Sequence, residues 1–170
     1  MSKRIGKYKI SKRESEVSLR DGGTVEGSIK FTGGGGLFKA NSSPTGTGTV
    51  LTNADSGKVI FMDASSANTI TLPAVANTTA GWNIKVILTT TGAAGIVQTS
   101  GTEDKLAGYV EESAANGGNH TLSADADADT VTFVNGAVPG DWVDIHSNGT
   151  LFYVFGKSAA ENKITFTKED

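Results

Sequence analysis

Apolar and polar positions alternate in short runs through the second part of the chain. The clearest run is 82–88, whose apolar members Trp82, Ile84, Val86 and Leu88 are spaced two residues apart. A period of two places these four side chains on one face of a half-buried β-strand. Turn signals bound further runs of β character, so that the predicted strands are 58–62, 69–72, 82–88, 95–99, 120–123, 130–134, 142–145, 151–155 and 163–167.

Turn residues separate these runs. Pro73 ends the strand before it, because proline has no N–H to donate to a ladder. The pairs Asn135-Gly136 and Asn148-Gly149 predict type I′ turns, since both residue types tolerate a positive φ. About nine short strands at this spacing predict an all-β fold, an antiparallel β-sandwich or barrel-like domain with low helix content. Only 105–115 is expected to form a helical turn or two. The C-terminal hairpin is expected to add Val143, Ile145, Phe152 and Val154 to the core.

The first 48 residues differ from the rest. Residues 1–32 carry apolar side chains too sparsely to bury a core, and we expect them to form an extended arm. Residues 33–48 contain four consecutive glycines and a Ser/Thr/Gly-rich stretch, the composition of a flexible connector. No Gly-Lys-Ser/Thr follows the glycines, so they do not match a phosphate-binding loop. The β domain is therefore expected at 49–170.

The composition limits the possible chemistry. The 170 residues contain no cysteine, two histidines and 22 glycines. Without cysteine there is no disulfide framework, no thiolate nucleophile and no Cys-ligated metal site. No apolar stretch reaches the ~20 residues of a membrane-spanning helix, and the basic start lacks the apolar segment of a secretory signal peptide. We expect one soluble domain with an arm, made in the cytoplasm.

Charge is divided unevenly along the chain. Residues 1–40 carry nine Lys and Arg against four Asp and Glu, a net charge of +5, whereas the other 130 carry six Lys against fourteen acids, a net charge of −8. Nucleic acid or an anionic membrane would attract the arm but repel the body, so we expect neither as a partner. An acidic protein surface explains the asymmetry better, and a solvated leader is the alternative. The candidate binding residues of the arm are Lys3, Arg4, Ile5, Lys7, Tyr8, Lys9, Ile10, Lys12, Arg13 and Arg20.

Three alternate acids have the spacing that opens an EF-hand calcium loop, namely Asp125, Asp127 and Asp129. The pattern then fails, because Thr130 and Gly136 occupy the positions where that loop needs glycine and glutamate. We expect a solvated loop that leads into the strand at Thr130, with a bound cation as the alternative.

The spacing assembles no catalytic group. For His120 and His146, the spacing suggests no nucleophile, partner carboxylate and convergent pocket of the kind that a general base needs. Asp144 lies two residues before His146, so both share one face of a predicted strand, where a simple contact is the expected role. We therefore predict no catalytic residues, no metal site and no cofactor, and a protein that is not an enzyme.

Two segments resemble a known group of proteins. Residues 57–92 contain a strand ending in T-L-P-A, followed by a strand of the form G-x-x-I-x-V. Residues 139–156 follow the pattern G-D-x-V-x-I-x-S-N-G-T-x-F-Y-V-x-G. Both resemble small structural proteins of tailed bacteriophages, a group that includes head decoration (cement) proteins and, less often, fibre and tail proteins. The resemblance covers residues 57–156 and none of the arm.

The resemblance implies a β-rich virion protein on the outer surface of the phage head, usually a homotrimer, made in the cytoplasm of the bacterial host. Its partner would be the shell of major capsid protein, which it would stabilise. An extended arm of about thirty residues would span on the order of 100 Å at ~3.3 Å per residue. Such an arm would reach a neighbouring subunit and add a strand to an exposed sheet edge.

A fibre or tail adhesin module that binds host-surface carbohydrate is the alternative. Such a module would present aromatic side chains to solvent. The aromatic content is only 7%, and Trp82 and Trp142 are both expected to face inward. The decoration protein is therefore the favoured hypothesis.

Overall fold

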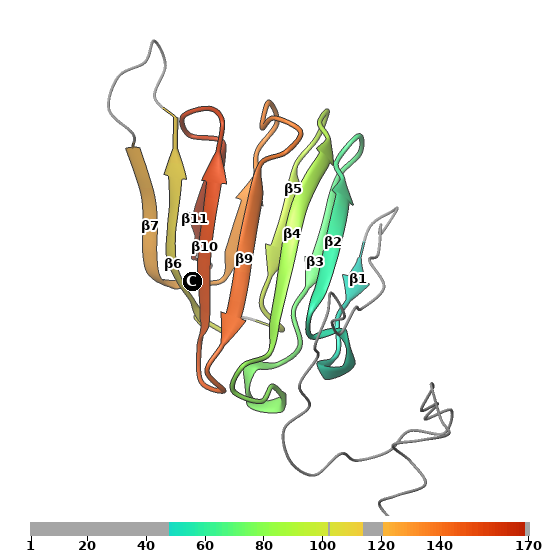
Figure 1. Ribbon diagram of the computed structural model, residues 1–170, viewed down its shortest axis with the longest axis vertical. Helices are drawn as coiled ribbons and strands as arrows, with labels where there is room; N and C mark the ends of the chain where they lie inside the picture. The colour runs from blue at the N-terminus through green and yellow to red at the C-terminus, as the bar shows by residue number, and fades with distance from the viewer. Residues whose placement is uncertain (1–47, 102, 114–120, 169–170) are drawn as a thin grey trace, which may run out of the picture. The chain divides into compact units, whose positions relative to one another are not determined.

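The computed structural model describes residues 48–101, 103–113 and 121–168 (Figure 1). The predicted arm, residues 1–32, lies outside the described residues together with all ten candidate binding residues. The same holds for His120, for the connector up to residue 47 and for the side chains of residues 121–126.

Two β-sheets pack against each other in a β-sandwich-like fold (Figure 1). The five-stranded sheet has the order β1 (Thr49–Val50), β3 (Asn68–Thr71), β5 (Gly95–Gln98), β8 (Thr130–Phe133) and β11 (Ile164–Thr167). The six-stranded sheet has the order β2 (Lys58–Asp63), β4 (Asn83–Thr90), β9 (Trp142–Ser147), β10 (Phe152–Ser158), β6 (Leu106–Glu112) and β7 (Thr121–Ala128). Two single-turn 3₁₀ helices, η1 (Asn53–Asp55) and η2 (Val75–Asn77), are the only helical elements among the described residues. The all-β prediction with low helix content is confirmed.

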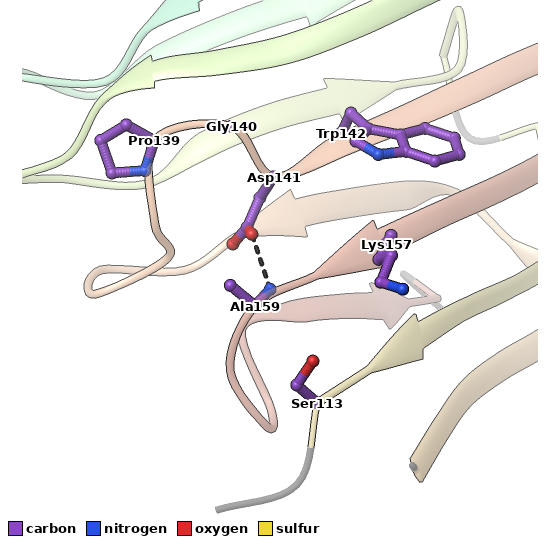
Figure 2. Close-up of a pocket in the computed structure, with 7 residues that line it drawn as sticks. All are labelled: Ser113, Pro139, Gly140, Asp141, Trp142, Lys157 and Ala159. Carbon is purple, nitrogen blue, oxygen red and sulfur yellow. Dashed lines mark hydrogen bonds between the residues drawn. The ribbon is translucent and has the colours of Figure 1, made fainter.

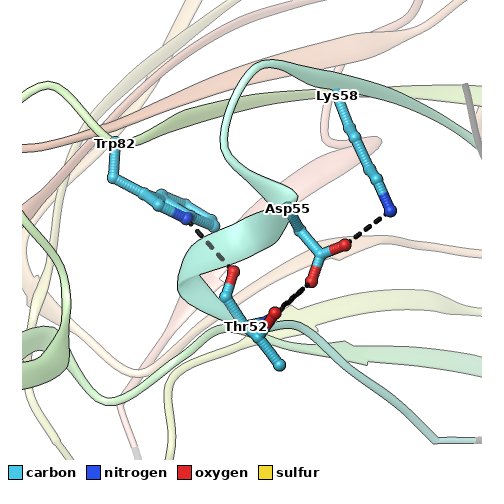
Figure 3. A network of polar contacts seen from close by, with 4 residues as sticks. All are labelled: Thr52, Asp55, Lys58 and Trp82. Atoms are coloured by element: carbon cyan, nitrogen blue, oxygen red, sulfur yellow. Dashed lines mark hydrogen bonds and ion pairs between the residues drawn. The ribbon is translucent and has the colours of Figure 1, made fainter. Parts of the chain in front are cut away.

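The core between the sheets is built from the alternate apolar positions of the strands. The predicted inner faces are confirmed, with at most 2% exposure at Trp82, Ile84, Val86, Leu88, Val143, Ile145, Phe152 and Val154. The Trp82 ring meets Phe152 edge-on, with centroids 5.7 Å apart. Its indole N–H donates to the carbonyl oxygen of Thr52 at 3.3 Å (Figure 3). Trp82 thus joins both a ring contact and a hydrogen bond in the core.

A polar network surrounds η1 beside this tryptophan (Figure 3). The backbone N–H and the hydroxyl of Thr52 both donate to Asp55 Oδ2, at 2.7 and 2.8 Å. The Lys58 ammonium lies 2.5 Å from Asp55 Oδ1. The Lys58 hydrogen bond, followed by those from Thr52, lowers the pKa of Asp55 to about 2. The network ties η1 to the first residue of β2.

The sheets are mixed, whereas the sequence predicts antiparallel pairing. β1–β3, β3–β5, β2–β4 and β10–β6 are parallel pairs. The reason is that the chain changes sheet after each of the strands β1 to β4, so β1 pairs with β3, β2 with β4 and β3 with β5. Turn residues mark where a strand ends, but they do not specify the sheet to which the chain returns.

The prediction of a helical turn or two within 105–115 is wrong, because this stretch contains the strand β6. Leu106 and Val110 are both fully buried, and their separation of four residues resembles a helical repeat. The position between them is Gly108, where a Cβ would lie 1.9 Å from the carbonyl oxygen of Val154. Positions 108 and 112 carry glycine and a buried glutamate where a strand would be expected to carry apolar residues. The period of two is therefore not visible in the sequence.

The acidic stretch 125–129 was predicted to be a solvated loop, but most of it belongs to β7, which pairs with β6. Ala128 pairs with the buried Leu106 and is itself fully buried, whereas Asp127 is exposed. The pairing with β6 shifts register between Leu106 and Gly108, so Ala124 lies opposite the outward Tyr109. Ala128 therefore acts as an inner position in a segment that reads as uniformly polar.

The two Asn-Gly pairs have different roles. Asn148-Gly149 does close the β9–β10 hairpin, in which Ser147 pairs with Phe152. Asn135-Gly136 connects β8 to β9, which lie in different sheets, so it closes no hairpin. In both pairs only the glycine has a positive φ, +92° at Gly136 and +89° at Gly149. The type I′ assignment is therefore wrong, since that turn needs a positive φ at both positions.

Candidate binding face

The outer face of the six-stranded sheet carries a group of exposed aromatic rings. Its central strands, β9, β10 and β6, bury every second residue and turn the others outward. We call this surface the aromatic face and define it by Phe61, Tyr109, Trp142, His146, Tyr153 and Phe155. Tyr109, Phe155 and Tyr153 are 47%, 40% and 37% exposed. These three make up most of the large apolar side chains exposed in the described part of the chain.

Strand register brings the rings together. Phe155 on β10 lies opposite Tyr109 on β6, and their rings meet edge-on with centroids 5.5 Å apart. On the other side of β10, His146 lies opposite Tyr153, and its ring is 6.4 Å from that of Phe155. Residues more than 40 positions apart in the sequence thus form one continuous row, which no local pattern contains.

Trp142 lies on this face and not in the core, so its predicted inward orientation is wrong. It is half-buried at the outer side of β9, whereas its neighbour Val143 is fully buried. The Lys85 ammonium lies 3.7 Å from the centroid of the indole ring, a cation–π contact. The sequence did contain the signal, because an inward Val143 and Ile145 require an outward Trp142 under a period of two.

The charges on the aromatic face form pairs. Lys85 donates to Asp144 Oδ2 at 3.1 Å, and the Lys157 ammonium lies 3.9 Å from Glu111. Asp144 and His146 share the face as predicted, but Asp144 binds Lys85 while the His146 ring packs near Phe155. Each of these two pairs balances one positive charge with one negative charge.

A pocket of about 300 Å³ lies at the end of this face beside Trp142 (Figure 2). Its wall is fixed by Asp141, whose carboxylate accepts hydrogen bonds from the backbone N–H groups of Val138 and Ala159 at 2.9 and 2.8 Å. The Ser158 hydroxyl donates to the same carboxylate at 3.0 Å. Ser113, Trp142 and Lys157 supply further side chains that line the pocket.

The acids of the proposed calcium loop do not converge in the described residues. Asp127 is exposed and pairs with Lys168 at 3.0 Å, whereas Asp129 is buried, and the side chain of Asp125 lies outside the described residues. Hydrogen bonds from Lys168 to Asp104 and Asp127 raise the pKa of the lysine. Across the described ranges no group of three or more His, Asp and Glu side chains is placed to hold a metal ion.

Comparisons with known proteins do not identify the chain. No family model matches the sequence, and neither the curated proteins nor the solved structures contain a match. Among the described residues, no helix has the length and apolar character needed to cross a membrane.

Proposed function

We propose that the protein is a head decoration (cement) protein of a tailed bacteriophage, which binds the outer surface of the major capsid protein shell and stabilises it. The observation that carries the proposal is the placement of the two segments that resemble such proteins. Residues 57–92 contain β2, β3 and β4, and residues 139–156 contain β9 and most of β10. β4 pairs with β9 along 83–87, so β2, β4, β9 and β10 are successive strands of one sheet.

Attachment is assigned to the basic arm. Residues 1–40 have a net charge of +5 and the remainder −8, so the arm is the part of the chain that an acidic capsid surface attracts. Association as a homotrimer would let three arms bind together, and the linked contacts would raise the overall affinity. Stabilisation needs no catalysis, because a ligand that binds only the assembled shell stabilises that shell by mass action.

The test is co-sedimentation of the full-length protein with undecorated heads of its phage. Replacing Lys7, Lys9 and Lys12 together by glutamate is expected to abolish binding, whereas the matched Lys→Arg replacements keep the charge and should bind fully. Binding should weaken as salt screens the arm. If the glutamate variant decorates heads as fully as the unchanged protein, the arm is excluded as the attachment segment. Equal rupture temperatures for decorated and bare heads would exclude the cement function.

A fibre or tail adhesin module that binds host-surface carbohydrate is the second candidate. The outward Trp142 and the exposed rings near it favour this candidate, because such a module presents aromatic side chains to solvent. Electron microscopy of the phage with the protein labelled separates the two locations. Label on the head supports the decoration protein, and label on the tail or fibres supports the adhesin.

A further inference from the structure

We infer that the aromatic face is a binding site for a neutral oligosaccharide. This inference deepens the carbohydrate-binding candidate by naming the site and the ligand class. It does not depend on where the protein is located, because a saccharide site can be displayed on a head or on a tail. It also does not depend on the arm.

The geometry of the rings fits a chain of sugars. Tyr109, Phe155 and His146 come from three adjacent strands, with neighbouring centroids 5.5 and 6.4 Å apart. Sugar rings present apolar C–H faces that stack on aromatic rings, and an array of exposed rings can contact several units at once. The pocket beside Trp142 lies at one end of the sheet and offers a more enclosed place for a single unit (Figure 2).

Polar groups stand between the rings, where sugar hydroxyls would lie. Asp144 supplies carboxylate oxygens, His146 supplies ring nitrogens, and the Tyr153 hydroxyl lies at the turn, 3.4 Å from the Asn148 amide. Lys157 lies opposite Trp142 on the neighbouring strand. Donors, acceptors and rings thus alternate along the face, as an amphipathic polyol requires.

The charges favour a saccharide over a protein partner. Lys, Asp and Glu are depleted at the centres of protein interfaces, but Asp144 lies opposite Phe155 in the middle of this face. Covering the Lys85–Asp144 pair with a dry apolar surface would cost desolvation energy, whereas hydroxyl groups can bond to both partners. In the second pair, the positive charge of Lys157 and the negative charge of Glu111 cancel in the same way. Because the charges cancel, the ligand that matches this face is neutral.

The opposite side of the sandwich supplies the control. In the described part of the chain, the outer face of the five-stranded sheet carries no large aromatic side chain, and we call it the threonine face. Its outward residues are Val50, Thr69, Thr71, Ile96, Gln98, Thr130, Thr132, Thr165 and Thr167. Substitutions there test whether any change at a solvated strand position disturbs binding.

The experiment is titration of the full-length protein with hexasaccharides of glucose, galactose, mannose and N-acetylglucosamine, and with a glucuronic-acid-containing hexasaccharide for comparison. Binding is followed by calorimetry and by NMR. We expect at least one neutral hexasaccharide to bind and to shift the Trp142 indole signal, with the signal of the buried Trp82 unchanged. Tyr109→Ala and Phe155→Ala should each weaken binding about tenfold or more, and Thr132→Ala should not.

Several results would overturn the inference. These are failure of every neutral probe to bind at millimolar concentration, binding of the acidic probe alone, and equal affinity of the Phe155→Ala and Thr132→Ala variants. Self-association that Phe155→Ala abolishes, without sugar binding, would show that a second copy covers the face. Folding of each variant is checked by circular dichroism. Phe155→Ala should still co-sediment with heads, so a failed saccharide site and a failed decoration function are distinguishable.

Discussion

The threonine face and the aromatic face lie on the two outer sides of one sandwich, and the same alternation produces both. On the threonine face the side chains bond to one another. The Thr130 and Thr167 hydroxyls are 2.7 Å apart, and the Gln98 amide donates to the Thr71 hydroxyl at 3.1 Å. On the aromatic face Tyr109 and Phe155 touch but remain 47% and 40% exposed. β-branched threonine suits a solvated strand, and the large apolar residue exposed on the threonine face is the edge-strand Val50, at 68%, whereas the aromatic face exposes a group of rings in mid-sheet.

This difference indicates that the fold does not require the exposed aromatic rings of the aromatic face. Both sheets contribute fully buried residues to one core, such as Val131 from one sheet and Val143 from the other, and this core is complete without any outward side chain. Threonine would serve on either outer face. A protein that exposes Phe155 and Tyr109 where threonine suffices keeps apolar surface in water, and binding of a ligand explains that placement.

The largest expected effect is on stability, and it compares a tryptophan in the core with a tryptophan on an outer face. Trp82→Ala removes a ring that is 1% exposed and packs on Phe152, and it should lower the free energy of unfolding by about 3–5 kcal/mol. Trp142→Ala removes an indole ring from the aromatic face and should lower the free energy of unfolding by only about 1 kcal/mol. Urea unfolding of both variants provides the measurement. Equal losses would mean that the distinction between inner and outer positions is wrong.

The next effect compares two neighbouring glutamates on β6. Glu112 points inward, is 2% exposed, and accepts backbone N–H bonds from Asn162, Lys163 and Ile164 at 2.9–3.1 Å. Because a charged acceptor makes strong hydrogen bonds, Glu112→Gln should destabilise the protein by about 1.5–3 kcal/mol. Glu111 points outward to the aromatic face, and Glu111→Gln should cost less than about 1 kcal/mol. Thermal unfolding of the pair checks this, and a larger loss at Glu111 would contradict it.

A smaller effect depends on pH and involves neither outer face. The pKa of Asp55 is about 2 in the folded protein, below its ordinary 3.8. A lowered pKa stabilises the fold above the unfolded value, so this contribution is complete above about pH 4 and is lost as pH falls toward 2. Asp55→Asn should therefore melt below the unchanged protein at about pH 5, and the gap should be much smaller at about pH 2. A gap that is the same at both pH values would contradict the cause assigned to the shift.

The smallest effect tests the two outer faces directly. Phe155→Ala and Thr132→Ala each change an outward residue in a strand, and both should alter the free energy of unfolding by only about 0.5 kcal/mol. Their effects on saccharide binding should differ about tenfold, as proposed above. Denaturant unfolding and titration on the same samples separate stability from binding. A loss of several kcal/mol at Phe155 would mean that the rings support the fold after all.

Period-two alternation determined most of the strands and the buried side chains from sequence alone. Trp82, Ile84, Val86 and Leu88 are confirmed as one inner face because apolar burial acts residue by residue along a strand. The alternation failed to predict a strand where an inward position carries no large apolar side chain. Gly108 and Glu112 concealed β6, and Ala128 concealed the end of β7 beyond the predicted strand 120–123, since glycine, glutamate and alanine do not mark a core face by themselves.

Only the tertiary structure decided which strands are neighbours and therefore what the candidate site contains. The aromatic face depends on β6 lying beside β10 and β10 beside β9, a strand order that skips along the sequence. Pairing between distant strands is set by how two whole sheets close over a shared core, which is a property of the complete chain. Tyr109 and Phe155 lie 46 positions apart in the sequence, and that order alone brings their rings into contact.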